Sequence, residues 1–367
     1  MSASNQATIE KSNLISPRQI AFVGCFLLPM AKLLEAPSIL AKYADGDLLL
    51  PALFHFLLQA VVLVALLYAS SKSKYTLFER LDAYLGRWAK ILYGLLTLYF
   101  LFVATLPLLD LEKFTYAVFF DTAPTVFSFG FFFLLSAFLC TKGLQALGRL
   151  ADFSLFLFVA PFLALLAMSF IESDLTRLLP LFGTDFGHTM SAFTHTFPHF
   201  SDVILLLPLL GNLRYEKGDG KKIVGGYAIG AAATLLFLSV FFGIYASLAG
   251  REHYAFSKIA QYFPILTTVG RVDLLFVYLL TIVLLFYTCM PLLYAVECAT
   301  RVSNGKNRLL FVVIFNLTAL LFVFYANKYY NGIYAFFTGR LPLFFFFIAD
   351  LLPLLFLLLP KNHTIQR

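Results

Sequence analysis

Residues 15–43 read ISPRQIAFVGCFLLPMAKLLEAPSILAKY, an apolar segment long enough to cross a bilayer but interrupted near its centre. Pro29 and Pro37 each remove a backbone donor and disfavour a continuous helix, which leaves free carbonyls at mid-depth. Lys32 and Glu35 place two charges between these prolines. Irregular backbone is tolerated within a membrane only where it is buried in protein or lines a cavity. We therefore expect a broken membrane helix beside a functional site.

A second apolar segment has the same character. Around Pro198 and Pro208 the sequence reads THTFPHFSDVILLLPLL. His199, Ser201 and Asp202 lie between these two prolines, as the charges do in the first segment. The sequence therefore predicts two broken membrane helices, each with polar side chains at its break.

The composition places the remaining chain in a membrane as well. Of the 367 residues, 60% are hydrophobic, 13% are charged and 44 are phenylalanine. A soluble domain carries about 25% charged residues, so the solvent of this chain is mostly lipid. We expect an all-α polytopic protein that forms one integral membrane domain over residues 1–367. The predicted spans are 18–42, 48–70, 90–119, 123–141, 151–171, 193–213, 223–248, 272–297, 308–326 and 341–360.

The net charge of +7 does not indicate nucleic-acid binding, because the basic residues cluster in alternate short loops. This pattern predicts a polar cytoplasmic N-terminus over residues 1–17, an even number of spans and a cytoplasmic C-terminus. The clusters are Lys11 and Arg18; Lys72, Lys74, Arg80, Arg87 and Lys90; Lys142 and Arg149; Arg214, Lys217, Lys221 and Lys222; Arg301, Lys306 and Arg308; Lys361 and Arg367.

The positions of the two broken helices predict how the spans are related. They are the first and sixth of ten, which is the pattern of two inverted five-helix repeats. We expect the repeats to cover residues 18–171 and 193–360.

One charged segment between the second and third spans cannot cross the membrane. Residues 74–87 read KYTLFERLDAYLGR, and Leu77, Phe78, Leu81 and Leu85 share one helical face. This spacing predicts an amphipathic helix that lies in the membrane interface.

Lys32 and Glu35 allow two interpretations. An unpaired charge at the centre of a membrane helix costs roughly 2.5–3.5 kcal/mol on insertion scales. The i,i+3 spacing would let the two side chains neutralise each other if the helix were continuous. Alternatively, one or both face a substrate or a proton path, because charges within the membrane mark functional sites.

The other candidate binding residues lie near the breaks or on neighbouring spans. Asp202, His199 and Ser201 offer an acceptor, a titratable ring and a hydroxyl near the second break, or else cap the helix end. Asp110 lies late in the third span. His195 and His199 lack a third ligand, so we predict neither a metal site nor a cofactor. The candidate substrate-binding set is Met30, Ala31, Lys32, Glu35, Asp110, His199, Ser201, Asp202, Tyr287 and Thr288.

Four segments in order resemble the B subunit, the amino-acid-permease-like component, of bacterial spore-germination receptors. Besides the opening ISPRQ, they are TLFERLDAYLGRWAKILYGLL at 76–96, KGLQALGRLADF at 142–153 and LTRLLPLFGTDFGHTMSAFTHTFPHFSDVILLLPLL at 175–210. The resemblance covers essentially the whole chain. It implies the five-plus-five inverted-repeat fold of the amino acid–polyamine–organocation transporter superfamily, and a small nutrient, typically an amino acid, bound near the breaks of helices one and six. It also implies partner receptor subunits of the A and C types.

The chain departs from this family at the break of helix one. Small residues such as Gly-Ala-Gly are usual there, and the matching positions are Met30, Ala31 and Lys32. Small residues let backbone amides approach a substrate carboxylate. Lys32 would instead supply the positive charge directly, occupy a cation site, or fill the pocket and abolish binding.

The leading functional hypothesis is a germinant-sensing receptor subunit in a bacterial cell membrane or spore inner membrane. The closest alternative is a stand-alone secondary transporter, coupled to protons or ions, for amino acids or small amines. A scaffold with a degraded pocket is a third reading. An enzyme is not expected, because the sequence lacks the carboxylate or histidine clusters that a membrane-embedded transferase needs.

Overall fold

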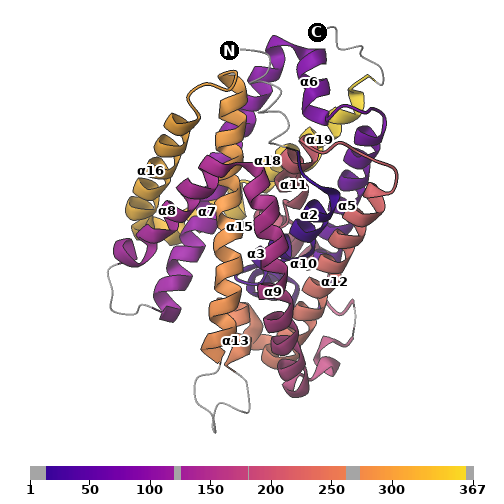
Figure 1. The fold of residues 1–367 in the computed structure, drawn as a ribbon. Helices are drawn as coiled ribbons and strands as arrows, with labels where there is room; N and C mark the ends of the chain where they lie inside the picture. The colour runs from indigo at the N-terminus through magenta and orange to yellow at the C-terminus, as the bar shows by residue number, and fades with distance from the viewer. Residues whose placement is uncertain (1–13, 120–124, 181, 262–272, 361–367) are drawn as a thin grey trace.

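The computed structural model describes residues 14–119, 125–180, 182–261 and 273–360. Within these ranges every regular element is a helix, as predicted (Figure 1). The chain is an all-α polytopic membrane protein. The first 13 residues of the predicted N-terminal tail and the first residues of the spans 123–141 and 272–297 lie outside the described residues.

Six helical segments are long and apolar enough to cross a membrane. The ninth predicted span ends at 326, but the observed segment continues through a 3₁₀ turn, η6 Asn327–Tyr329, and α17 Tyr330–Arg340. The six begin with α5 Leu49–Ser71, α7 Arg87–Phe119, α9 Leu144–Glu172, α12 Asp219–Tyr245, α15 Asp273–Val302 and α16 Arg308–Ala326.

A bent pair of helices makes a seventh candidate span at the position of the first predicted one. Its two arms meet at an angle of 60°. The first arm contains α2 Pro17–Phe22, the π-helix η1 Val23–Leu27 and α3 Leu28–Lys32; the second contains α4 Ala36–Ala44 and the 3₁₀ turn η2 Asp45–Asp47.

Three shorter apolar helices occupy the fourth, sixth and tenth predicted positions, so every predicted span has a helical counterpart. The sixth is broken as expected, although its first arm begins before the predicted start at 193. The elements are α8 Thr125–Lys142; α10 Phe186–His195, η4 Phe197–His199 and α11 Asp202–Gly211; and α18 Pro342–Phe345, the π-helix η7 Phe346–Leu351, α19 Leu352–Leu354 and η8 Leu355–Leu358.

The predicted amphipathic helix is observed as α6 Leu77–Leu85. Thr76 and Glu79 form a capping box in which each side chain accepts the backbone amide of the other residue. Leu77, Phe78 and Leu81 are buried, which confirms the apolar face, and Arg80 is buried with them.

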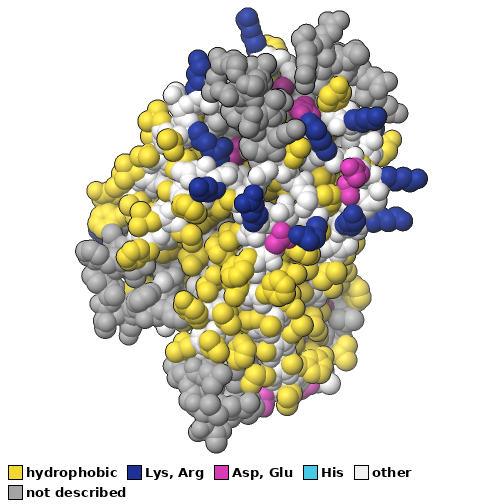
Figure 2. All heavy atoms as spheres, viewed as in Figure 1, with side chains coloured by type: hydrophobic (Ala, Val, Ile, Leu, Met, Phe, Trp, Pro, Cys, Tyr) yellow, Lys and Arg dark blue, Asp and Glu magenta, His cyan; other side chains and the backbone are white. Residues whose placement is uncertain are grey.

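The surface separates into a belt and a charged end. Figure 2 shows hydrophobic side chains around the lower and middle part of this face, and lysine and arginine side chains gathered above it. The charged part is the end of the molecule that holds α6 in Figure 1. By the positive-inside rule this would be the cytoplasmic end; the sidedness of the termini and the two-repeat division stay predictions.

Candidate functional site

The break of helix one is closed by backbone amides at the start of a distant short helix, α13 Ala255–Ala260. The Leu33 carbonyl would normally bond the amide of residue 37, but Pro37 has no N–H to donate. The Phe256 amide donates to Leu33 instead, at 3.1 Å, and the Ala255 amide donates to the Leu34 carbonyl at 3.0 Å. The carbonyl that Pro37 leaves without its helical partner is therefore satisfied by the protein, and so is the carbonyl of Leu34.

Residues 253–256, which lead into the first turn of α13, also contact the Glu35 side chain, and we call this segment the strap. His253 Nδ1 lies 2.9 Å from Glu35 Oε2. This hydrogen bond raises the pKa of His253 above its usual value. Glu35 is buried, whereas the His253 side chain is 69% exposed. The strap therefore ties a buried carboxylate at the break to a ring that water can reach.

Lys32 pairs with the broken sixth helix and not with Glu35. Its Nζ lies 2.5 Å from Asp202 Oδ1 and donates to the Leu28 carbonyl at 3.1 Å. The Tyr227 hydroxyl donates to Asp202 Oδ2 at 3.1 Å. The interpretation of Lys32 and Glu35 as a self-neutralising pair is wrong, because the chain bends between them and sends each side chain to a different partner.

This ion pair is enclosed by aromatic rings. Lys32 Nζ lies 5.2 Å from the centroid of the Phe200 ring and 5.9 Å from that of Phe56. Lys32 is only 1% exposed and Asp202 2%. A buried pair is stable only if its remaining polar atoms are also bonded, which the Leu28 carbonyl and the Tyr227 hydroxyl provide. The pair acts as a fixed joint between the two broken helices.

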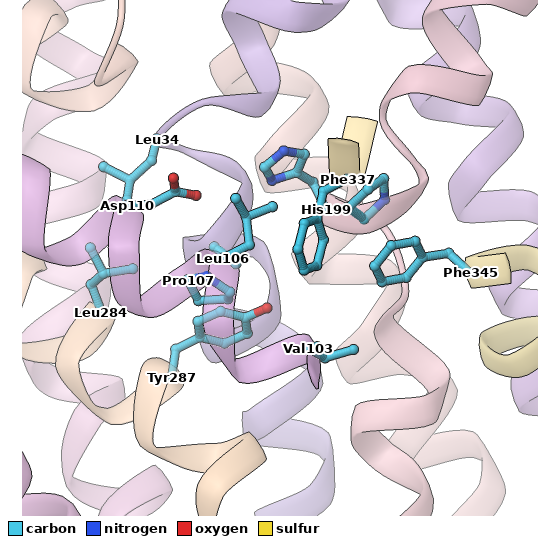
Figure 3. A pocket seen from close by; sticks show the side chains of 12 residues that line it. Leu34, Val103, Leu106, Pro107, Asp110, His199, Leu284, Tyr287, Phe337 and Phe345 are labelled. Atoms are coloured by element: carbon cyan, nitrogen blue, oxygen red, sulfur yellow. The ribbon is translucent and has the colours of Figure 1, made fainter. Parts of the chain in front are cut away.

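A small cavity of about 30 Å³ lies beside this joint (Figure 3). The close-up shows Asp110 on one side, His199 and Phe345 on the other, and Tyr287 below. Asp110 is buried, and its Oδ1 accepts a hydrogen bond of 2.7 Å from the Tyr330 hydroxyl of α17. The cavity lining is Ala31, Leu34, Val103, Leu106, Pro107, Asp110, Pro198, His199, Leu284, Tyr287, Phe337 and Phe345.

A much larger hollow of about 900 Å³, the vestibule, opens where the strap meets α4. Tyr334 of α17 lines the vestibule, and Phe337, about one helical turn further along, lines the cavity. A single helix therefore borders both spaces. The vestibule lining includes Ser38, Lys42, Tyr43, Asp45, His195, Gly250, Arg251, His253, Tyr334 and Thr338.

The structure distributes the predicted site residues over three places. Ala31, Asp110, His199 and Tyr287 line the cavity. Lys32 and Asp202 form the joint, and Glu35 lies at the strap. The remaining three are buried outside the cavity lining: Met30, Ser201, whose hydroxyl donates to Phe197, and Thr288, whose hydroxyl donates to Leu284. A binding role for all ten stays a prediction.

Several partners of the predicted site residues are not apparent from the sequence. Tyr227 bonds Asp202, Tyr330 bonds Asp110 and His253 bonds Glu35. Tyrosine is common in this chain and carries no positional signal. Gln59 and Asp350, which bond each other, do carry one, because each is a polar residue within an apolar run.

The sequence profile of the spore germination protein family matches residues 15–331. No curated protein matches the chain. Among solved structures, Mhp1, a nucleobase-cation-symport-1 family transporter in a closed conformation with bromovinylhydantoin bound, is similar at a TM-score of 0.56 and 14% identity, over 92% of this chain and 79% of that one. An inward-facing conformation of Mhp1 gives a TM-score of 0.46 at 11% identity, over 89% and 75%. At these identities the likeness concerns the fold alone.

Proposed function

The chain belongs to the spore germination protein family, and we propose that it is the germinant-sensing subunit of a spore germination receptor. In this proposal a permease-like membrane protein binds a small nutrient such as an amino acid. The A- and C-type receptor subunits would be its partners, and they would turn ligand binding into a germination signal.

The cavity beside the two breaks is the observation that carries this proposal. Asp110 is a buried carboxylate on its wall, and one of its oxygens, Oδ1, accepts a hydrogen bond of 2.7 Å from the Tyr330 hydroxyl. A buried carboxylate is a strong acceptor for an ammonium group. We therefore assign the amino group of the ligand to Asp110.

His199 supplies a complementary group on the opposite wall. Its Nε2 is buried and has no hydrogen-bond partner among the described residues. The tautomer with a proton on Nε2 can donate to a carboxylate or another acceptor of the ligand. An acceptor for an ammonium and a donor for a carboxylate face each other across one space, which favours an amino acid over a simple amine.

The size of the cavity implies that binding involves a conformational change. About 30 Å³ corresponds to roughly one water molecule. An amino acid needs several times this volume, so the walls must separate before it enters. The vestibule offers the approach, and α17, which borders both spaces, is the element whose displacement would join them.

Binding and uptake of labelled amino acids and small amines by the purified chain in proteoliposomes would test the proposal. We expect saturable binding of at least one amino acid, without accumulation driven by a proton gradient. Asp110→Asn should weaken this binding roughly ten- to hundredfold, because a hydrogen bond to a charged group contributes about 1.5–3 kcal/mol.

Glu112→Gln is the matched control, since Glu112 lies on the same helix outside the cavity lining and accepts from Asn327. Accumulation driven by the gradient would instead establish the stand-alone secondary transporter. If the full panel fails to bind both alone and after co-expression with the partner subunits, the sensing role is wrong.

A further inference from the structure

Asp350 is a buried acid that the proposed ligand site does not use. It is 1% exposed and lies on the π-helix η7 of the tenth span. Short π-helical turns within membrane or soluble helices occur frequently at functional sites. One carboxylate oxygen, Oδ1, accepts a hydrogen bond from Gln59 Nε2 at 2.5 Å. The other, Oδ2, has no partner among the described residues.

Gln59 connects this acid to the break of helix six. Its Oε1 accepts the backbone amide of Val203 at 2.8 Å, which fixes the amide so that its NH₂ group faces Asp350. Val203 directly follows Asp202, the acid of the joint. A change at Asp350 therefore reaches the second arm of helix six through one side chain.

Among the residues that the structure describes, no cation pairs with Asp350. The charged group with which it interacts electrostatically is the Asp202 carboxylate, which has the same sign. The helix α5, which packs against η7, carries a titratable group, His55. The Nε2 atom of His55 is bonded to the Phe193 carbonyl and the Thr196 hydroxyl and not to Asp350.

Two further titratable groups face Asp350. They are tyrosines, Tyr99 of α7 and Tyr227 of α12, and neither supplies a positive charge. The contrast with Asp202 is direct, because that acid has Lys32 at 2.5 Å.

We propose that Asp350 is a proton-binding site, occupied by a proton on Oδ2 in the state described here. An ionised carboxylate in this position would be a bare charge within the membrane, which costs several kcal/mol, whereas a protonated carboxyl is neutral. The Gln59 amide then bonds the carbonyl oxygen of the acid, Oδ1.

Release of this proton would create a second anion beside Asp202. Both anions would then compete for Lys32, the cation of the joint, and the joint between helices one and six would loosen. A proton on Asp350 thus favours the intact Lys32–Asp202 pair, and loss of the proton favours separation of helices one and six. This inference does not depend on which ligand the cavity binds.

Infrared spectroscopy of the full chain in lipid bilayers at neutral pH tests the proposal without any ligand. We expect a carbonyl-stretching band of a protonated carboxyl group in the wild type, and its loss in Asp350→Asn. Asp110→Asn serves as the comparison, and the Asp350 band should survive it. A wild-type spectrum without such a band, or a band unchanged by Asp350→Asn, would overturn the proposal.

A second variant keeps the test decisive if Asp350→Asn does not fold. Gln59→Met removes the hydrogen bond to the carbonyl oxygen and keeps a side chain of similar length. The same band should then move to higher frequency, because a carbonyl stretch stiffens when its hydrogen bond is lost. A band that keeps its frequency in Gln59→Met belongs to another acid and refutes the assignment. Neither outcome bears on ligand binding at Asp110, so this proposal and the proposed function can fail separately.

Discussion

The two ends of the molecule differ in how they are closed. At the α6 end, the buried Arg80 donates to the carbonyls of Ala69 at 2.6 Å, Leu359 at 2.9 Å and Pro360 at 3.1 Å. At the strap end, the vestibule of about 900 Å³ is bordered by His253, whose side chain is 69% exposed.

A second arginine strengthens the closed end. Arg301 donates to Asn212 at 2.7 Å, lies 3.5 Å from Asp82 and stacks 4.8 Å from the centroid of the Phe78 ring. Phe78 in turn packs so closely on Gly211 that a Cβ atom there would lie 2.4 Å from the ring. The α6 end is therefore held by two multiply bonded arginines, of which Arg80 is buried, whereas the strap end is bordered by an exposed imidazole. Under the proposed function, this difference assigns the ligand's approach to the strap end.

The largest loss of folding stability is expected from a substitution in the joint, which lies between the two ends. Lys32→Met leaves Asp202 charged and buried without its cation, which should destabilise the folded protein by about 3–5 kcal/mol. Denaturant unfolding in detergent micelles would measure the loss. Adding Asp202→Asn should recover most of it, because the double variant removes both charges and keeps an acceptor for Tyr227. A single variant as stable as the wild type would show that the pair is not a joint.

The second-largest loss of stability is expected from a substitution that weakens the closed α6 end. Arg80→Met removes three hydrogen bonds from a charged donor and should cost about 1.5–3 kcal/mol. The buried Cys298, one turn from Arg301, should then react faster with a thiol reagent, as measured by mass spectrometry. Arg87→Met, which alters an exposed cation that begins α7, should change neither quantity. Equal labelling of Cys298 in Arg80→Met and the wild type would contradict the assignment.

The smallest effect is expected at the strap end, where His253 should make the stability of the folded protein weakly dependent on pH. Glu35 raises the pKa of His253, so the charged ring is stabilised in the folded state. This contribution is full below the unfolded pKa of about 6.5 and disappears as the pH rises through the higher folded value. The effect should be small because the ring is 69% exposed. Thermal unfolding between about pH 6 and 8 should show a fall in stability that His253→Gln removes and His188→Gln, at an exposed position, retains.

The fold was largely predictable because its signals are local. Apolar runs define all ten helical positions, and Pro29, Pro37 and Pro198 mark the two breaks. The extension through α17 was not predicted, because its composition is mixed and its start is held by Asn327 bonding Glu112 on another helix. Such a contact leaves no periodic pattern in the sequence.

The site was predictable in its residue types but not in its partners. Lys32 is 170 positions from Asp202, and spacing along one helix favours the wrong partner, Glu35. The two amides that the strap donates have no sequence signal, because any residue other than proline carries a backbone amide. Four of the ten predicted residues line the cavity, and the two breaks bring them together.

The strap sets the register between two parts of the chain. Phe256, Ala255 and His253 contact Leu33, Leu34 and Glu35 in antiparallel order. Inserting one residue between His253 and Ala255 would shift the imidazole relative to the amides, so that both could not bond at once. The length of this segment is therefore constrained even where its side chains are not. Homologues should vary freely in the composition of the loop before His253, but keep the spacing from His253 to Phe256.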